Sequence, residues 1–61
     1  MNFNKIEQEL KLQGRKKNWL IKELNSYAME YHRVKNNQKE LPLSWSVKIP
    51  QILHVSIDKL K

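Results

Sequence analysis

The sequence predicts an all-α fold of five short helices in a single domain of 61 residues. Apolar residues recur at the three- and four-residue intervals of one helix face, as Leu20, Leu24, Tyr31 and Val34 illustrate. Glycine, asparagine and proline interrupt these runs, so each helix is expected to be brief. The apolar stretch after Pro42 is too dense and irregular for a strand with one wet face. A chain this small buries only about 60% of the surface that its unfolded form exposes, which predicts a slender margin of stability.

The first helix is expected over residues 4–13. Asn4 can cap its start, and Glu7 follows three residues later, as in a capping box. Ile6 and Leu10 share the inward face, and the single glycine of the chain then ends the helix.

The next two helices are expected over residues 17–24 and 27–35. Asn25 lies between them, and asparagine tolerates the left-handed conformation that a tight corner needs. In the second of these helices, Tyr31 and Val34 form the inward face. Two short helices joined by a corner can present the outer face of the second helix to a DNA groove.

The fourth helix is expected in the apolar stretch after Pro42. Pro50 costs on the order of 3 kcal/mol inside a helix unless it falls in the first turn, so this helix should start late, near Ser46, or kink. Ser56 can cap a fifth, short helix, with Asp58 close to its positive end.

Basic residues are concentrated in the middle of the chain. The whole chain has a net charge of +6, and residues 11–39 carry eight basic side chains against two acidic ones, while the flanks nearly cancel. This excess coincides with the predicted helical corner. Neutralisation of DNA phosphates and release of counterions require such a cationic surface. We therefore interpret the charge as part of a DNA-binding surface rather than as a solubilising one.

Several function classes lack support in the sequence. There is no cysteine, hence no disulfide framework and no thiolate metal site, and His32 and His54 stand far apart without nearby ligand partners, so we expect no metal. No carboxylate pair, activated nucleophile or glycine-rich phosphate loop indicates an enzyme, and we expect neither a cofactor nor a small-molecule substrate. No stretch approaches the roughly 20 apolar residues of a membrane span, so we expect a cytoplasmic protein without a membrane partner.

From Gly14 to Leu60 the chain resembles the helix-turn-helix domain of lambda-type phage repressors and Cro proteins, a family also found among bacterial regulators. The resemblance implies a compact five-helix, lambda-repressor-like DNA-binding domain with its helix-turn-helix at about residues 17–35. The similarity has two parts. The first is the helix-turn-helix motif with its leucines, its corner residue and its closing asparagine. The second is a signature in the tail, in which leucine is followed by valine-serine, then by aspartate and then by a second leucine. The matching positions are Leu20, Leu24, Asn25, Tyr31, Val34 and Asn36 in the motif, and Leu53, Val55, Ser56, Asp58 and Leu60 in the tail.

The chain departs from the family pattern at several positions. Ile21 replaces the small alanine usual after the first leucine, which crowds the place where two helices cross. Asn37 replaces the glycine that follows the recognition helix, and Pro50 replaces an alanine. Many relatives can pair an arginine late in the first helix with a glutamate that ends the third. This chain has Leu10 and Lys35 there, so we expect Lys35 to reach solvent or a phosphate.

In this family the recognition helix enters the major groove with its N-terminal end first, which implies base contacts from the outward face of residues 27–35. Arg33 is the best candidate for guanine because its guanidinium can donate two hydrogen bonds to O6 and N7, although a phosphate contact is an equal alternative. Ala28 or Met29 can touch a thymine methyl, and His32 can donate to a base or a phosphate, or simply be solvated. The residues expected near base edges are Tyr27, Ala28, Met29, His32 and Arg33.

Contacts to the DNA backbone are expected on either side of the recognition helix, at the start of the second helix and in the loop after the third. The residues concerned are Arg15, Lys16, Lys17, Asn36, Gln38 and Lys39. Leu43 and Trp45 lie around the start of the fourth helix, from which dimers of this family often build their contact. One such domain reads only a half-site, so we expect a weak or DNA-assisted homodimer.

Together these features predict a small sequence-specific transcriptional regulator of Cro or repressor type. The resemblance implies a phage or prophage origin and repression by occluding a promoter, with double-stranded DNA as the partner. The alternative is a helix-turn-helix module of anti-repressor or antitoxin kind, which binds another regulator rather than DNA. The placement of charge favours the first hypothesis.

Overall fold

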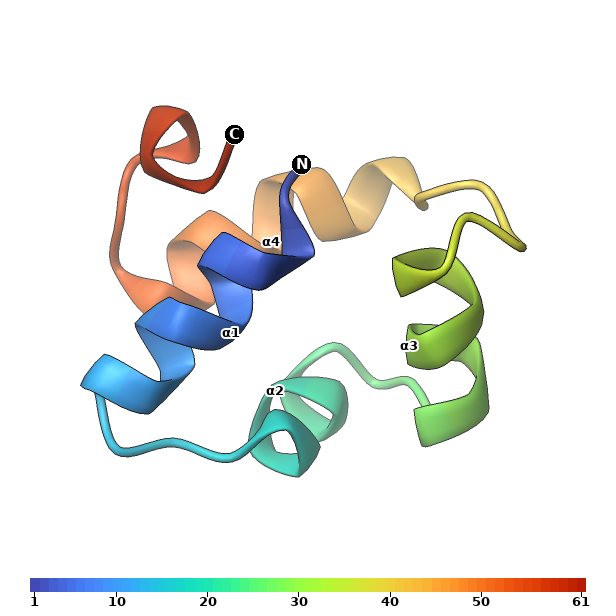
Figure 1. Cartoon of the computed structure of the whole chain (residues 1–61), viewed down its shortest axis with the longest axis horizontal. Helices are drawn as coiled ribbons and strands as arrows, with labels where there is room; N and C mark the ends of the chain where they lie inside the picture. Colours follow the sequence, from blue (N-terminus) through green and yellow to red (C-terminus); the bar gives the residue numbers. More distant parts are fainter.

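Four α-helices and one 3-10 helix make up the fold, and the computed structural model describes all 61 residues (Figure 1). The α-helices are α1 (Phe3–Leu12), α2 (Lys17–Glu23), α3 (Ala28–Lys35) and α4 (Leu43–Leu53), and the 3-10 helix is η1 (Ile57–Leu60). No strand is present, so the predicted all-α class is confirmed. The longest helix has 11 residues, and none is both long and apolar enough to cross a bilayer.

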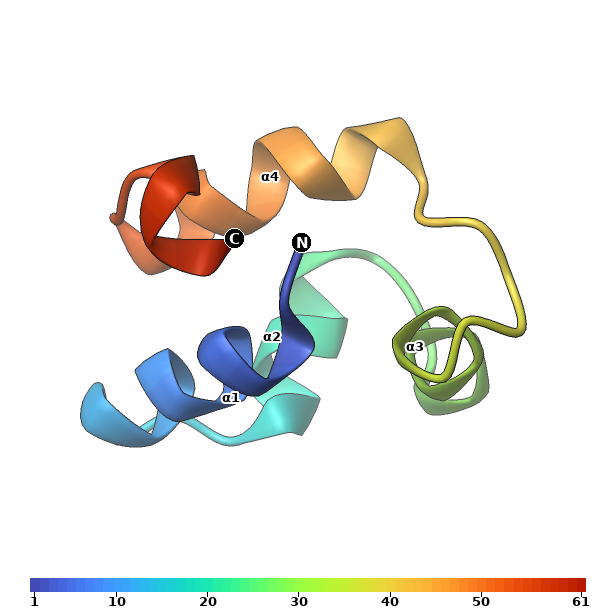
Figure 2. The same cartoon turned by 45° about the horizontal axis from the view of Figure 1, so that its top comes forward.

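The helices surround one small core. Figure 2 shows α4 on one side of the core, α1 and α2 on the other, and α3 across one end. The backbone N–H of Asn2 donates to the carbonyl of Leu60 at 2.7 Å, which holds the first and last turns side by side. Every α-helix and η1 contribute to the core, and all of its members are apolar or aromatic. They are Ile6, Leu10, Leu20, Ile21, Leu24, Tyr31, Val34, Trp45, Ile49, Leu53 and Leu60.

The start of α1 differs from the prediction. Asn2, not Asn4, is the capping residue, and its side-chain oxygen accepts hydrogen bonds from the backbone N–H groups of Asn4 at 2.9 Å and Lys5 at 3.3 Å. Asn2 has the extended backbone that turns a cap side chain back towards the first helical turn. The predicted capping box is therefore wrong, which leaves Glu7 free for a tertiary contact.

The start of α4 also differs. The helix begins directly after Pro42, not near Ser46, and it continues through Pro50. A proline at the N-cap needs no N–H partner, and its fixed φ, here −60°, suits a helix start. Pro50 falls near the end of α4, where its missing N–H removes only the bond to the carbonyl of Ser46, while its own carbonyl accepts from the N–H of Val55 at 3.1 Å.

The expected fifth α-helix is a single 3-10 turn. The N–H of Lys59 donates to the carbonyl of Ser56 at 3.1 Å, which is the three-residue spacing of a 3-10 helix. The Ser56 side chain makes no capping hydrogen bond. This turn places Leu60, which is 1% exposed, in the core.

All four α-helices end in the same way, with one residue in the left-handed conformation. At the end of α2, the N–H of Asn25 donates to Lys22 and that of Ser26 to Ile21, both at 3.1 Å, which is the pattern of a Schellman motif. The left-handed residues are Gly14, Asn25, Asn37 and His54, with φ values of 70°, 57°, 60° and 56°. The predicted roles of Gly14 and Asn25 in ending their helices are confirmed, whereas the same role for His54 was not foreseen.

Histidine is the least suitable of these four residues for a left-handed backbone, because its Cβ crowds the following carbonyl and it lacks the short polar side chain with which asparagine can hydrogen-bond locally. We predict that His54→Gly raises the free energy of unfolding by about 0.5–1 kcal/mol. Urea denaturation of the variant and the wild type measures the change. Asn37→Gly is the matched substitution and should gain less, since asparagine tolerates this conformation. An equal or smaller gain at His54 contradicts the explanation.

Candidate nucleic-acid interface

Helix α3 has one buried face and one free face. Tyr31 and Val34, three residues apart, are 0% and 3% exposed, so they fix which side of the helix meets the core. Tyr27, the N-cap of α3, and Met29 are both 58% exposed. Ala28, His32 and Arg33 are exposed as well. All five residues predicted to lie near base edges are therefore at the surface.

A four-residue connection sets the position of α3 against α2. Leu24 is the C-cap of α2 and is 4% exposed, Asn25 turns the chain, and Tyr27 is the N-cap of α3. Ile21, which is larger than the alanine of the resembling family, is accommodated at the core edge with 7% exposure. Hydrophobic packing on both sides of the corner thus holds the two helices together.

Tyr31 anchors α3 to the rest of the molecule. Its ring meets Phe3 edge-on, with centroids 5.5 Å apart, and stacks on Trp45 with centroids 6.4 Å apart. Its hydroxyl donates to a carboxylate oxygen of Glu7 at 2.9 Å. Burial, together with this neighbouring carboxylate, raises the pKa of Tyr31, so the phenol stays protonated and keeps donating.

Glu7 also binds Lys35, which corrects the expectation that Lys35 reaches solvent or a phosphate. The Lys35 ammonium lies 2.8 Å from Glu7, and both side chains are about three-quarters buried, with exposures of 26% and 23%. Partial burial opposes ionisation of Glu7, but hydrogen bonds from Lys35 and Tyr31 and the charges of Lys35 and Lys17 outweigh it and lower its pKa. Helices α1 and α3 are thus linked by an ion pair.

The basic residues before and at the start of α2 are free of acidic partners. Arg15, Lys16 and Lys17 are exposed and form no ion pair. The guanidinium of Arg15 lies over the ring of Trp19 at 4.3 Å from its centroid, a cation–π contact that restrains the arginine while leaving it exposed. Three predicted backbone contacts are therefore accessible and lie together in the chain.

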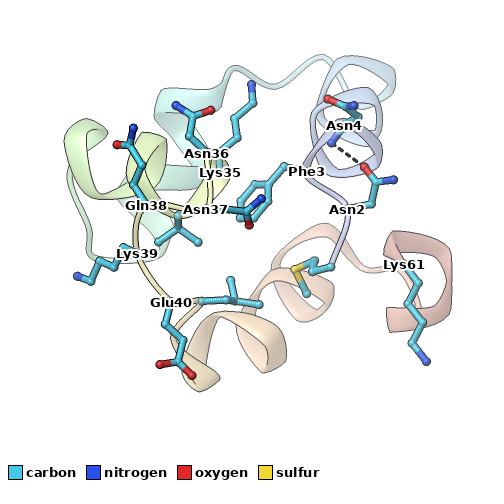
Figure 3. Close-up of a pocket in the computed structure, with 13 residues that line it drawn as sticks. Asn2, Phe3, Asn4, Lys35, Asn36, Asn37, Gln38, Lys39, Glu40 and Lys61 are labelled. Atoms are coloured by element: carbon cyan, nitrogen blue, oxygen red, sulfur yellow. Dashed lines mark hydrogen bonds between the residues drawn. The ribbon is translucent and has the colours of Figure 1, made fainter.

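The loop after α3 carries the other predicted backbone contacts. Asn36 and Gln38 are exposed at the edge of an open groove that the N-terminal residues line on its other side (Figure 3). Lys39 also lines this groove, and its ammonium pairs with Glu30 of α3. Unlike Asn36 and Gln38, Lys39 is therefore already engaged within the protein.

The two residues predicted to mediate a dimer have different environments. Trp45 is 4% exposed and stacks on Tyr31 in the core, so it has almost no surface for a second copy, and its predicted dimer role is corrected. Leu43 is 82% exposed, and Val47, one turn further along α4, is 56% exposed. An apolar strip on α4 thus remains uncovered.

Ion pairs neutralise a third of the basic side chains, and most of the unpaired ones lie in one part of the chain. Four ion pairs occupy Lys35, Lys39, Lys59 and Lys61. The other eight of the twelve basic side chains form none, and six of these eight lie between positions 11 and 33, all exposed. The six are Lys11, Arg15, Lys16, Lys17, Lys22 and Arg33.

Sequence reasoning missed the roles of Glu7 and Glu30. Glu7 and Lys35 are 28 positions apart, and no local pattern links them. For Glu30 the sequence offers a weak signal, because Ser26 precedes it by four residues, a spacing at which side chains can meet. In the structure the Ser26 hydroxyl donates to Glu30 at 2.6 Å.

Comparisons with known proteins add no relative. No protein-family model matches the chain, and neither the curated proteins nor the solved structures contain a match.

The lowered pKa of Glu7 predicts a pH-dependent contribution to stability. A carboxyl whose pKa is lowered by folding stabilises the native state above its unfolded value, near the ordinary 4.5, and this contribution is lost as the pH falls through the folded pKa. At pH 7 we expect Glu7→Gln to lower the free energy of unfolding by about 1–2 kcal/mol. At pH 3 the difference from the wild type should shrink.

Denaturant titrations at pH 7 and pH 3 measure both differences. Glu40→Gln is the matched control, because Glu40 is exposed and forms no ion pair. Equal effects of the two substitutions at pH 7 contradict the role assigned to Glu7.

Proposed function

We propose that this protein is a sequence-specific DNA-binding regulator in which α2 and α3 form a helix-turn-helix. The observation that carries the proposal is the exposed outer face of α3 together with six exposed cations between positions 11 and 33 that have no carboxylate partner. A rigid helix with a free outer face can enter the major groove, and neighbouring cations can bind the flanking phosphates. The regulator acts by occupying a promoter, as the resemblance to repressors and Cro proteins implies.

Two further features support this family resemblance. The corner residue Asn25 is left-handed, as the glycine of the resembling motif must be. Glu7 and Lys35 join the first and third helices, as the arginine and glutamate of many relatives can do, although Leu10, three positions after Glu7, holds the place of that arginine. Both features support a fold in which packing against α1 and α2 fixes the orientation of α3.

In the proposed complex, Tyr27, Ala28, Met29, His32 and Arg33 face the bases. Arg33 can bind guanine through two parallel hydrogen bonds, and Met29 can cover a thymine methyl group. Arg15, Lys16 and Lys17 bind the backbone on one side of the groove, with Asn36 and Gln38 on the other. Phosphate contacts set register and affinity, while the α3 contacts supply sequence preference.

A protein-interaction module is the competing proposal. The exposed apolar residues Leu43 and Val47 favour it, because a strip of this kind can contact another protein or a second copy of this chain. A purely protein-binding module, however, has no need of six unpaired, exposed cations between positions 11 and 33. The two proposals differ in the salt dependence of binding to DNA.

We predict that binding to mixed-sequence DNA weakens steeply as salt rises, and that Lys17→Ala lowers the slope of log K against log salt by about 0.9. Lys17 is exposed and starts α2, where a phosphate can replace water around its ammonium. Fluorescence anisotropy with a labelled duplex at several salt concentrations measures the slope.

Lys48→Ala is the matched control for Lys17→Ala. Lys48 lies on α4, across the core from α2 (Figure 2), and it is also exposed and unpaired. An unchanged slope for Lys17→Ala removes Lys17 from the interface, and salt-independent binding by the wild type overturns the DNA proposal.

We also predict that Arg33→Ala flattens the preference at one base-pair position by about 1–3 kcal/mol. Selection of bound duplexes from random DNA, repeated with wild type and variant, measures this preference. Lys22→Ala is the control, because Lys22 is exposed on α2 and is not among the proposed base contacts. A loss that is uniform over all sequences assigns Arg33 to a phosphate instead.

A further inference from the structure

Glu30 is the only acidic residue of α3, and both of its carboxylate oxygens have partners. The hydroxyl of Ser26 donates to one oxygen at 2.6 Å, and the ammonium of Lys39 donates to the other. The side chain of Glu30 is 20% exposed and that of Lys39 is 44% exposed. These contacts lower the pKa of Glu30, the Lys39 hydrogen bond contributing most. The pair is thus accessible to solvent and solutes, yet fully formed.

The turn after α3 brings Lys39 back to this carboxylate. Asn37 is left-handed, and the backbone N–H groups of Gln38 and Lys39 both donate to the carbonyl of Arg33, at 2.8 and 3.2 Å. The loop is thereby folded against the last turn of α3. From this position the Lys39 side chain reaches Glu30, nine residues earlier in the chain.

The Glu30–Lys39 pair lies next to the residues proposed to contact DNA. Glu30 directly follows Met29 and precedes Arg33 by three positions, so Glu30 and Arg33 are neighbours on the surface of α3. A DNA phosphate offers anionic oxygen acceptors of the same kind as the carboxylate. A phosphate close to α3 would therefore compete with Glu30 for the same lysine.

We propose that Glu30 is an internal competitor of DNA phosphate, which holds Lys39 in the free protein and keeps its charge from adding to non-specific affinity. This inference rests on the proposed function. While it is paired with Glu30, Lys39 adds no net positive charge when the protein binds DNA of any sequence. The base contacts of α3 consequently account for a larger share of the affinity at a preferred site.

Glu30→Gln tests the inference because glutamine keeps an oxygen for Ser26 but cannot form an ion pair with Lys39. We expect tighter binding to mixed-sequence DNA at low salt, by about 3- to 10-fold, and a salt slope steeper by about one. Glu23→Gln is the matched control, since Glu23 is exposed on α2 without an ion pair. It changes the net charge equally and should leave the slope unchanged. Equal slopes for the two variants overturn the inference.

Glu30→Gln could strengthen DNA binding in two ways, by freeing Lys39 or by removing a carboxylate that repels phosphate. Lys39→Met distinguishes these two explanations. In the wild-type background this substitution should leave the salt slope nearly unchanged, because Glu30 already neutralises Lys39. In the Glu30→Gln background it should reverse the added slope and most of the gain in affinity. If Glu30→Gln strengthens binding equally with and without Lys39, repulsion alone explains the effect and the inference is wrong.

A measurement without DNA keeps this test distinct from that of the proposed function. In an NMR titration of the free protein, the Glu30 carboxyl should titrate below its ordinary range, and Lys39→Met should move it upwards. No movement means that the pair is absent in solution, which overturns the inference while leaving the proposed DNA binding intact. If the pair is present but neither wild type nor variants bind DNA in a salt-dependent way, the proposed function fails and the inference fails with it.

Discussion

The burial of Tyr31 is the constraint on which the arrangement of helices depends. Its ring lies between Phe3 of α1 and Trp45 of α4, and it is fully buried although it belongs to a helix whose opposite face is bare. A buried phenol needs a hydrogen-bond partner, and Glu7 supplies one. Because Glu7 also binds Lys35, one carboxylate fixes two positions of α3, a turn apart. The orientation of α3 thus follows from a few contacts that a chain of 61 residues can provide.

The acidic residues serve mainly to hold the molecule together. Four of the six carboxylates form ion pairs: Glu7 and Glu30 with lysines of α3 and the loop after it, and Glu9 and Asp58 with lysines near the C-terminus. None of these pairs engages the cations around α2. Four of the eight basic side chains without an ion pair, Arg15, Lys16, Lys17 and Lys22, lie just before or on α2. The lysines that form ion pairs are thus different residues from the unpaired cations of the proposed interface.

Local signals in the sequence predicted most of the fold. Apolar spacing identified Ile6, Leu10, Leu20, Tyr31 and Val34 as buried, since helical periodicity determines which residues share a face. Asparagine at the α2–α3 corner predicted the left-handed turn, because few residues adopt that backbone at low cost. The errors in the helix bounds fell at helix starts: the cap of α1 lies two residues before the predicted one, and α4 begins three residues before its predicted start. A histidine in the left-handed position after α4 carried no such signal.

The sequence by itself determined the helical class, the positions of the α2 and α3 segments, the inward residues of α3 and the excess of positive charge, because each depends on composition or on spacing within one helix. Tertiary structure alone decided that Trp45 is buried rather than exposed, that Lys35 and Lys39 are paired, and that Leu43 and Val47 stay uncovered. These outcomes depend on which side chains meet across helices far apart in the chain. Packing around a shared core determines these contacts between helices, and the local periodicity of the sequence does not predict them.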